Sequence, residues 1–147
     1  MRRAVRPVRR HRQTGSIVEQ RIESVRDVAE RFSYGMAQLM AGRDDDLDDC
    51  ADAALAMRMR SAMAPFLVSG ERVCPDFGSF AELRVDGDLT GATPVDAVLE
   101  FEDRSLRETG DGRGLVPPRR RIALHLRMSL DPCMVQDCAV VVSAGRQ

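Results

Sequence analysis

The sequence predicts an α+β fold: a long N-terminal helix and a helical hairpin, followed by a small mixed domain with a helix and a C-terminal antiparallel β-hairpin. Three observations predict it. Apolar residues recur at helical spacing in the first third, turn-forming residues become frequent after Pro65, and apolar and polar residues alternate near the C terminus. The 147 residues suffice for about one domain. We divide them into a basic arm (1–15), a helical hairpin (16–66) and an α+β domain (67–147).

The first segment is strongly basic. All 22 basic residues of the chain are arginines, and six of them precede the first acidic residue, Glu19: Arg2, Arg3, Arg6, Arg9, Arg10 and Arg12. The rest of the chain is acidic, since the 23 Asp and Glu all lie there. Such an arm suits an acidic protein surface or nucleic acid, an organelle-targeting segment, or a solvated tail. We expect protein contact, with nucleic acid as the second candidate.

A seam of apolar residues predicts the long helix. Ser16 and Glu19 have the spacing of a capping box, which places the helix start there. The seam then follows at alternating spacings of four and three, and it consists of Val18, Ile22, Val25, Ala29, Phe32, Met36 and Leu39. A seam this narrow must pack against another element. Two partners remain open: the next helix of the same chain, or helices of other chains.

A second helix is expected from Asp46 to Ala64. Aspartates at its start interact favourably with the positive end of the helix dipole. Pro65 is expected to end the helix. Its apolar residues form one stripe, which predicts an antiparallel hairpin with the first helix. Cys50 and the other cysteines lack C-x-x-C spacing, and neither histidine is spaced as a ligand to them. We therefore expect free thiols and no bound metal or cofactor.

The remaining elements are one helix and three strands. Alternation predicts a strand ending at Asp86-Gly87 and another over Ile122–Leu130. A third strand, over 137–143, follows a turn around Asp131-Pro132 and is expected to pair with the second as a hairpin. Residues 95–108 carry two conflicting signals. Thr93-Pro94 resembles a helix start, whereas Val95, Ala97, Leu99 and Phe101 alternate as in a strand. We expect a helix there from the caps.

A turn-rich stretch resembles a motif of the baseplate-wedge, or sheath-initiator, family of contractile phage tails, type VI secretion and related injection machines. The residues that carry the resemblance are Gly70, Glu71, Arg72, Pro75, Asp76, Phe77 and Gly78, with Pro118 and Arg119 later in the chain. Two features depart from the family pattern: one residue fewer between Arg72 and Pro75, and Pro117 where the family has a glutamate. The resemblance spans about residues 47–145.

The resemblance implies a non-enzymatic structural subunit of a large assembly. Such a subunit would nucleate a contractile sheath by strand addition, with Val140 and Val142 on the added edge, and dock its helix seam into a bundle. The turn residues would then be structural. We expect protein partners, including a second copy of the chain, and a cytoplasmic or particle-associated location, with organelle targeting left open. The alternative is a nucleic-acid- or ribosome-associated subunit using the arginine arm.

Catalysis has little support in the sequence. His125 is the only histidine outside the arm, and it falls on the polar side of its predicted strand. The chain contains no G-x-S-x-G motif and no phosphate-binding glycine pattern. No run approaches the ~18 apolar residues of a membrane-spanning helix. We therefore expect no enzymatic activity and no membrane span.

Overall fold

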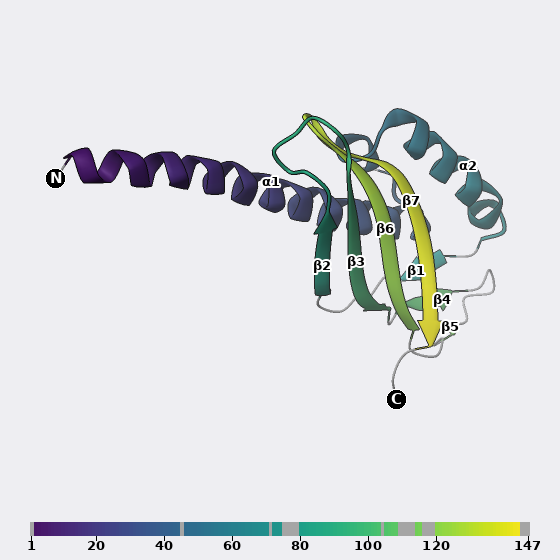
Figure 1. The fold of residues 1–147 in the computed structure, drawn as a ribbon. Helices are drawn as coiled ribbons and strands as arrows, with labels where there is room; N and C mark the ends of the chain where they lie inside the picture. Colours follow the sequence, from purple (N-terminus) through teal and green to yellow (C-terminus); the bar gives the residue numbers. More distant parts are fainter. Residues whose placement is uncertain are drawn as a thin grey trace.

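A long helix crosses one face of a four-stranded antiparallel sheet, and a second helix stands beside the edge of that sheet (Figure 1). The computed structural model describes residues 2–44, 46–70, 72–74, 80–103, 105–108, 114–115 and 120–144. Its helical elements are α1 (Arg2–Met40), the short 3-10 helix η1 (Leu47–Asp49) and α2 (Ala53–Val68). The α+β class is confirmed, with two N-terminal helices followed by the sheet.

The four-stranded sheet has the order β2-β3-β6-β7, so β2 and β7 are its edges. Its strands are β2 (Phe80–Asp86), β3 (Val95–Asp103), β6 (Arg120–Leu130) and β7 (Cys133–Ala144). A smaller antiparallel sheet has the order β1-β4-β5, formed by β1 (Arg72–Cys74), β4 (Leu106–Glu108) and β5 (Gly114–Leu115). The predicted strand before Gly87 and the predicted C-terminal hairpin are confirmed, the latter with Leu124 opposite Val140.

The core lies between α1 and the inner face of the large sheet. Val25, Ala29 and Phe32 of α1 are fully buried, and they belong to one apolar cluster with residues of every layer. Its sheet members include Leu99, Phe101, Leu124, Leu126 and Met128. The predicted antiparallel hairpin is therefore corrected: the sheet covers the seam of α1, and α2 adds Leu55 and Ala56 to the same core. A sheet can cover the seam because alternate residues of β3 and β6 point to that face.

Both helices have boundaries that differ from the expectation. α1 begins at Arg2, so the capping-box pair Ser16 and Glu19 lies inside the helix. Extending a helix that already exists adds a hydrogen bond per residue fixed, without a new nucleation step. The expected second helix is divided into η1 and α2, and α2 continues past Pro65 to Val68. The division occurs where Ala51 forms a bridge to Val135 of β7.

The helix expected over 95–108 is wrong, because residues 95–103 form strand β3. Its side chains alternate between buried and more exposed along the whole strand, and Val95, Ala97, Leu99 and Phe101 are almost completely buried. Only an extended chain places every second residue on one face. Val98, which interrupts the alternation, lies on the opposite face of the sheet across from His125. The structure therefore follows the alternation rather than the apparent helix cap at Thr93-Pro94.

Candidate protein-binding edge

The two halves of edge strand β7 have different surroundings. The first half is covered by the chain itself: the Val135 amide donates to the Cys50 carbonyl, and the Asp52 amide donates to the Val135 carbonyl, both at 2.8 Å. Ala51 thus forms a one-residue parallel bridge to Val135 on the outer side of β7. This segment closes the sheet edge at its N-terminal end.

A β-bulge separates the covered half from the rest. Arg127 of β6 pairs with Asp137, while the next residue, Met128, pairs with Val135, so Gln136 is an extra residue in β7. Arg58 of α2 contacts Asp137 through an ion pair at 3.3 Å. Both side chains are exposed, so this contact adds little stability. Bulges and charges of this kind usually blunt an open sheet edge.

Beyond the bulge, residues 138–144 read Cys-Ala-Val-Val-Val-Ser-Ala and carry no charge. Val140, Val141 and Val142 expose 50%, 51% and 48% of their surface, whereas Val135 in the covered half of the same strand is fully buried. Val140 and Val142 lie opposite Leu124 and Ile122, whose side chains are buried under the helices. The apolar inner face of the sheet therefore continues onto β7 past the point where the helices cover it.

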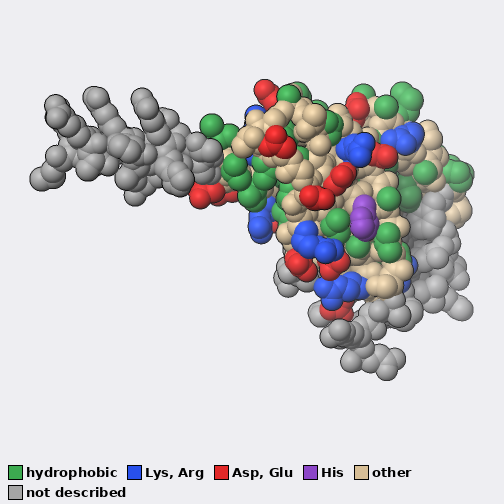
Figure 2. All heavy atoms as spheres, in the orientation of Figure 1, with side chains coloured by type: hydrophobic (Ala, Val, Ile, Leu, Met, Phe, Trp, Pro, Cys, Tyr) green, Lys and Arg blue, Asp and Glu red, His purple; other side chains and the backbone are tan. Residues whose placement is uncertain are grey.

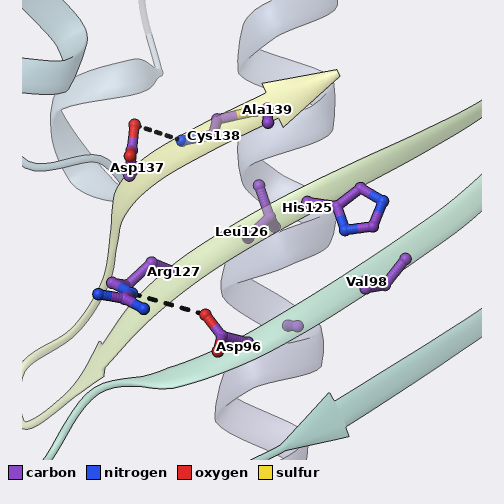
Figure 3. A pocket seen from close by; sticks show the side chains of 9 residues that line it. Asp96, Val98, His125, Leu126, Arg127, Asp137, Cys138 and Ala139 are labelled. Atoms are coloured by element: carbon purple, nitrogen blue, oxygen red, sulfur yellow. Dashed lines mark hydrogen bonds and ion pairs between the residues drawn. The ribbon is translucent and has the colours of Figure 1, made fainter. Parts of the chain in front are cut away.

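The opposite face of the sheet is open and contains a shallow depression of about 540 Å³ (Figure 3). His125 lies there between its cross-strand neighbours Val98 and Ala139. Charged side chains lie around the histidine and the apolar side chains beside it (Figure 2). They pair with one another, Arg127 with Asp96 at 3.5 Å and Glu100 with both Arg84 and Arg121. The face offers a broad contact surface rather than a deep binding pocket.

Buried polar groups flank this sheet. Asp103 is almost fully buried at the end of β3; it accepts hydrogen bonds from the Ser105 amide at 2.9 Å and from Arg120 at 2.7 Å. Burial opposes its ionisation, but the hydrogen bonds from Ser105 and Arg120 outweigh burial and lower its pKa. On β7, burial and the Asp137 carboxylate raise the pKa of the Cys138 thiol to about 11. Burial raises that of Cys50 to about 11 as well.

The structure separates the predicted partner-binding residues into two groups. In the helix seam, Val25, Phe32 and Leu39 are buried in the core of the same chain, and Met36 packs against that core. The seam is thus occupied by the chain's own sheet over this length, while Val18 and Ile22 nearer the N terminus remain half-buried. Val140 and Val142, by contrast, are available on the surface.

Most of the predicted turn motif lies outside the described residues. This applies to Glu71, to Pro75, Asp76, Phe77 and Gly78, and to Pro118 and Arg119. Gly70 is exposed with φ of 82°, a conformation that favours glycine. Arg72 begins β1 and pairs in register with Glu108 of β4. The six arginines of the basic arm lie within α1, in its first turns, and their side chains are outside the described set.

Sequence reasoning missed the features that delimit the open stretch. Neither Arg58 nor the bulge at Gln136 was predicted, Ala51 was expected only in the apolar stripe of the second helix, and Val141 only as part of a strand. A signal existed for Val141, since it stands between two other valines and so breaks strict alternation. Nothing local predicts the contact of Ala51 with Val135, because the two are far apart in sequence.

In the described part of the chain, no group of three or more His, Cys, Asp or Glu side chains is arranged to hold a metal ion. The helices of that part include none with the length and apolar character needed to cross a bilayer.

Neither a protein family model nor a curated protein matches the chain. Two solved structures are similar to it. The intermembrane-space region of the chloroplast protein ARC6 aligns with a TM-score of 0.54 and 12% identity, over 80% of this chain and 93% of that one. A de novo designed β-sheet protein aligns with a TM-score of 0.45 and 16% identity, over 84% and 92%. At such identities the likeness to the ARC6 region concerns the fold alone.

Proposed function

We propose that this chain is a non-enzymatic structural subunit that joins other protein chains in a larger assembly by adding a strand to edge β7. The observation that carries the proposal is the contrast along β7. The chain closes the edge at Val135 with its own backbone, but it leaves the uncharged residues 138–144 with three half-exposed valines.

Strand addition uses the physical properties of this edge. An added strand gains main-chain hydrogen bonds along its length, and its alternate side chains set the register. Val140 and Val142 offer apolar contacts on the inner face, and Val141 offers one on the outer face. An uncharged, β-branched edge of this kind invites aggregation in an isolated protein. A partner strand would remove that liability.

The kind of assembly is a separate part of the proposal. The resemblance to sheath initiators favours a contractile injection machine, but most of its turn residues lie outside the described set. Within the span of the resemblance, residues 95–103 form strand β3 instead of the expected helix. The proposal therefore concerns strand addition by an assembly subunit, and the contractile machine is one setting for it.

The proposal is tested by co-expression with the products of the genes on either side of this one. We expect a defined neighbour to co-purify with the wild-type chain and to be lost with Val141→Lys, because a lysine on an edge strand opposes pairing. Val68→Lys is the matched control, since Val68 lies at the end of α2 and is 86% exposed. Equal recovery of the neighbour with Val141→Lys and wild type would contradict the proposal.

A further inference from the structure

The open stretch of β7 is nearly symmetric in chemistry about Val141. Val140 and Val142 flank it, Ala139 and Ser143 follow, and Cys138 and Ala144 lie at the ends. Each position thus has a counterpart of similar size and polarity at the same distance on the other side of Val141. A strand with this property can pair antiparallel with an identical strand across a two-fold axis.

We propose that β7 binds β7 of a second copy of this chain, antiparallel and with the two-fold axis at Val141, so that the two four-stranded sheets become one. This inference rests on the proposed function and names the partner strand. In this register Val141 faces Val141 of the second copy, Val140 faces Val142, and Ala139 faces Ser143. Small and β-branched side chains meet at every position, as such cross-strand pairs require.

The absence of charged side chains along the stretch suits a second copy as the occupant. Over residues 138–144 the paired strands place no charged side chain opposite another. Ala123 of β6 is in register with Val141. In the dimer, a row of four side chains therefore crosses the outer face of the joined sheet: Ala123 and Val141 of one copy, then Val141 and Ala123 of the other. Identical charges facing each other would oppose a homodimer, and this row contains none.

The boundaries of the stretch fit the same register. Asp137, with its Arg58 partner, lies just before the uncharged residues, so in the dimer it falls outside the paired segment at each end. The bridge of Ala51 to Val135 lies further back and prevents any longer pairing. Among the residues that the structure describes, the part of β7 without a neighbouring strand on its outer side is therefore the part that is self-complementary.

The backbone geometry agrees with this arrangement. The Cys138 amide donates to the Asp137 carboxylate at 3.0 Å. Amides of every second residue along a strand point to the same side, so we expect the amides of Val140 and Val142 to point to the same side as that of Cys138, toward the open edge. They would then bond across the axis, and Val141 would occupy a close non-hydrogen-bonded pair with its counterpart, where side chains approach most closely.

The first test measures molar mass by sedimentation equilibrium over a roughly hundredfold range of concentration, because a dimer is favoured by mass action. The wild-type mass is expected to rise from 16.3 kDa toward twice that value. Val141→Lys is expected to remain a monomer at every concentration, with unchanged circular dichroism because Val141 is half-exposed. Val68→Lys is expected to dimerise like wild type. A wild-type monomer throughout, or a Val141→Lys dimer, overturns the proposal.

The second test uses charge complementation and does not depend on the behaviour of a single variant. Val141→Lys and Val141→Glu are each expected to be monomeric, because like charges meet at the axis. Their equimolar mixture is expected to recover the dimer, because opposite charges then face each other. If both single variants dimerise, or if the mixture stays monomeric although each variant is folded, the register is overturned.

A cross-link fixes the register independently. In a background with the native cysteines replaced by serine, Val141→Cys is expected to form an intermolecular disulfide under mild oxidation, since a non-hydrogen-bonded pair brings the two Cβ atoms within the range a disulfide needs. Ser143→Cys alone is expected not to cross-link, because its counterpart is Ala139. Cross-linking of Ser143→Cys as efficiently as Val141→Cys would contradict the axis at Val141.

The outcomes also separate this inference from the proposed function. If the wild-type chain is a monomer but Val141→Lys still abolishes recovery of a neighbouring gene product, then β7 takes a strand of a different protein. The second copy is then overturned and strand addition stands. If neither molar mass nor recovery responds to Val141→Lys, both proposals fail.

Discussion

The Val135 amide of β7 donates to the Cys50 carbonyl at 2.8 Å, which joins the segment before α2 to the edge of the large sheet. This contact determines where the edge is closed and, by its position, where the edge stays open. It also draws Cys50 into the core, where its side chain is fully buried. The architecture around β7 thus depends on residues that lie far apart in sequence.

Truncation of Phe32 tests the packing of α1 on the sheet. Phe32 is fully buried in the central cluster, so Phe32→Ala is expected to lower the free energy of unfolding by about 3–5 kcal/mol, through lost burial and a new cavity. Urea denaturation measures the loss. Tyr34→Ala on the exposed side of α1 is the control and is expected to change stability by about 0.5 kcal/mol or less. Similar losses for both variants would contradict the assignment of the buried face.

The turn after β2 depends on a glycine. Gly87 has φ of 131°, and a Cβ there would lie 2.9 Å from Cγ1 of Val95. Gly87→Ala is therefore expected to destabilise the protein by about 1–3 kcal/mol, measured by thermal denaturation. Gly91→Ala serves as the control, because Gly91 does not have a positive φ and its new Cβ would approach only Asp88, at 3.0 Å from Oδ2 and 3.8 Å from the carbonyl oxygen. A Gly91→Ala loss as large as that of Gly87→Ala would argue against backbone strain at Gly87.

The ion pair of Asp103 and Arg120 predicts a pH-dependent contribution to stability. Because the pKa of Asp103 is lowered from 3.8 on folding, its stabilisation is present above that value and disappears as the pH falls through the folded-state pKa. Asp103→Asn is expected to cost about 1.5–3 kcal/mol near neutral pH, and the difference from wild type should shrink below pH 3.8. Denaturation at a series of pH values measures it. A difference that stays constant down to the lowest pH would show that the charge has no part in it.

The thiols of buried Cys50 and partly buried Cys138 predict that stability is lost at alkaline pH instead. Cys50 and Cys138 have pKa values raised to about 11, so between pH 9 and 11 the unfolded chain loses protons that the native chain keeps. Stability should therefore fall as pH rises over this window, by roughly 1.4 kcal/mol per pH unit per thiol. The Cys50→Ala, Cys138→Ala double variant is expected to reduce this slope, and denaturation across the window tests it. An unchanged slope would rule out the thiols as its origin.

Alternation determined more of the fold than cap residues did. The strands before Gly87 and over Ile122–Leu130 could be predicted because one face of each packs on the core. The strand near Val140 has no such alternation, and its run of three β-branched valines was the signal for it. Residues 95–103 carried the same signal, but Thr93-Pro94 outweighed it in the prediction. The burial of Phe101 inside the sheet shows that long-range packing decides such a conflict. Similarly, the seam of α1 predicted a buried face without identifying the element that buries it.

The sequence by itself determined which residues favour burial, since the apolar seam of α1 and the alternating apolar residues of β3 and β6 are local properties of the chain. Only the tertiary structure decided that the large sheet covers Phe32 and that Val141 remains half-exposed on an edge strand. The reason is physical: the position of a strand within a sheet depends on hydrogen bonds between distant segments, such as that from Val135 to Cys50. The pattern of residues within a strand does not show whether another strand is hydrogen-bonded to its outer edge.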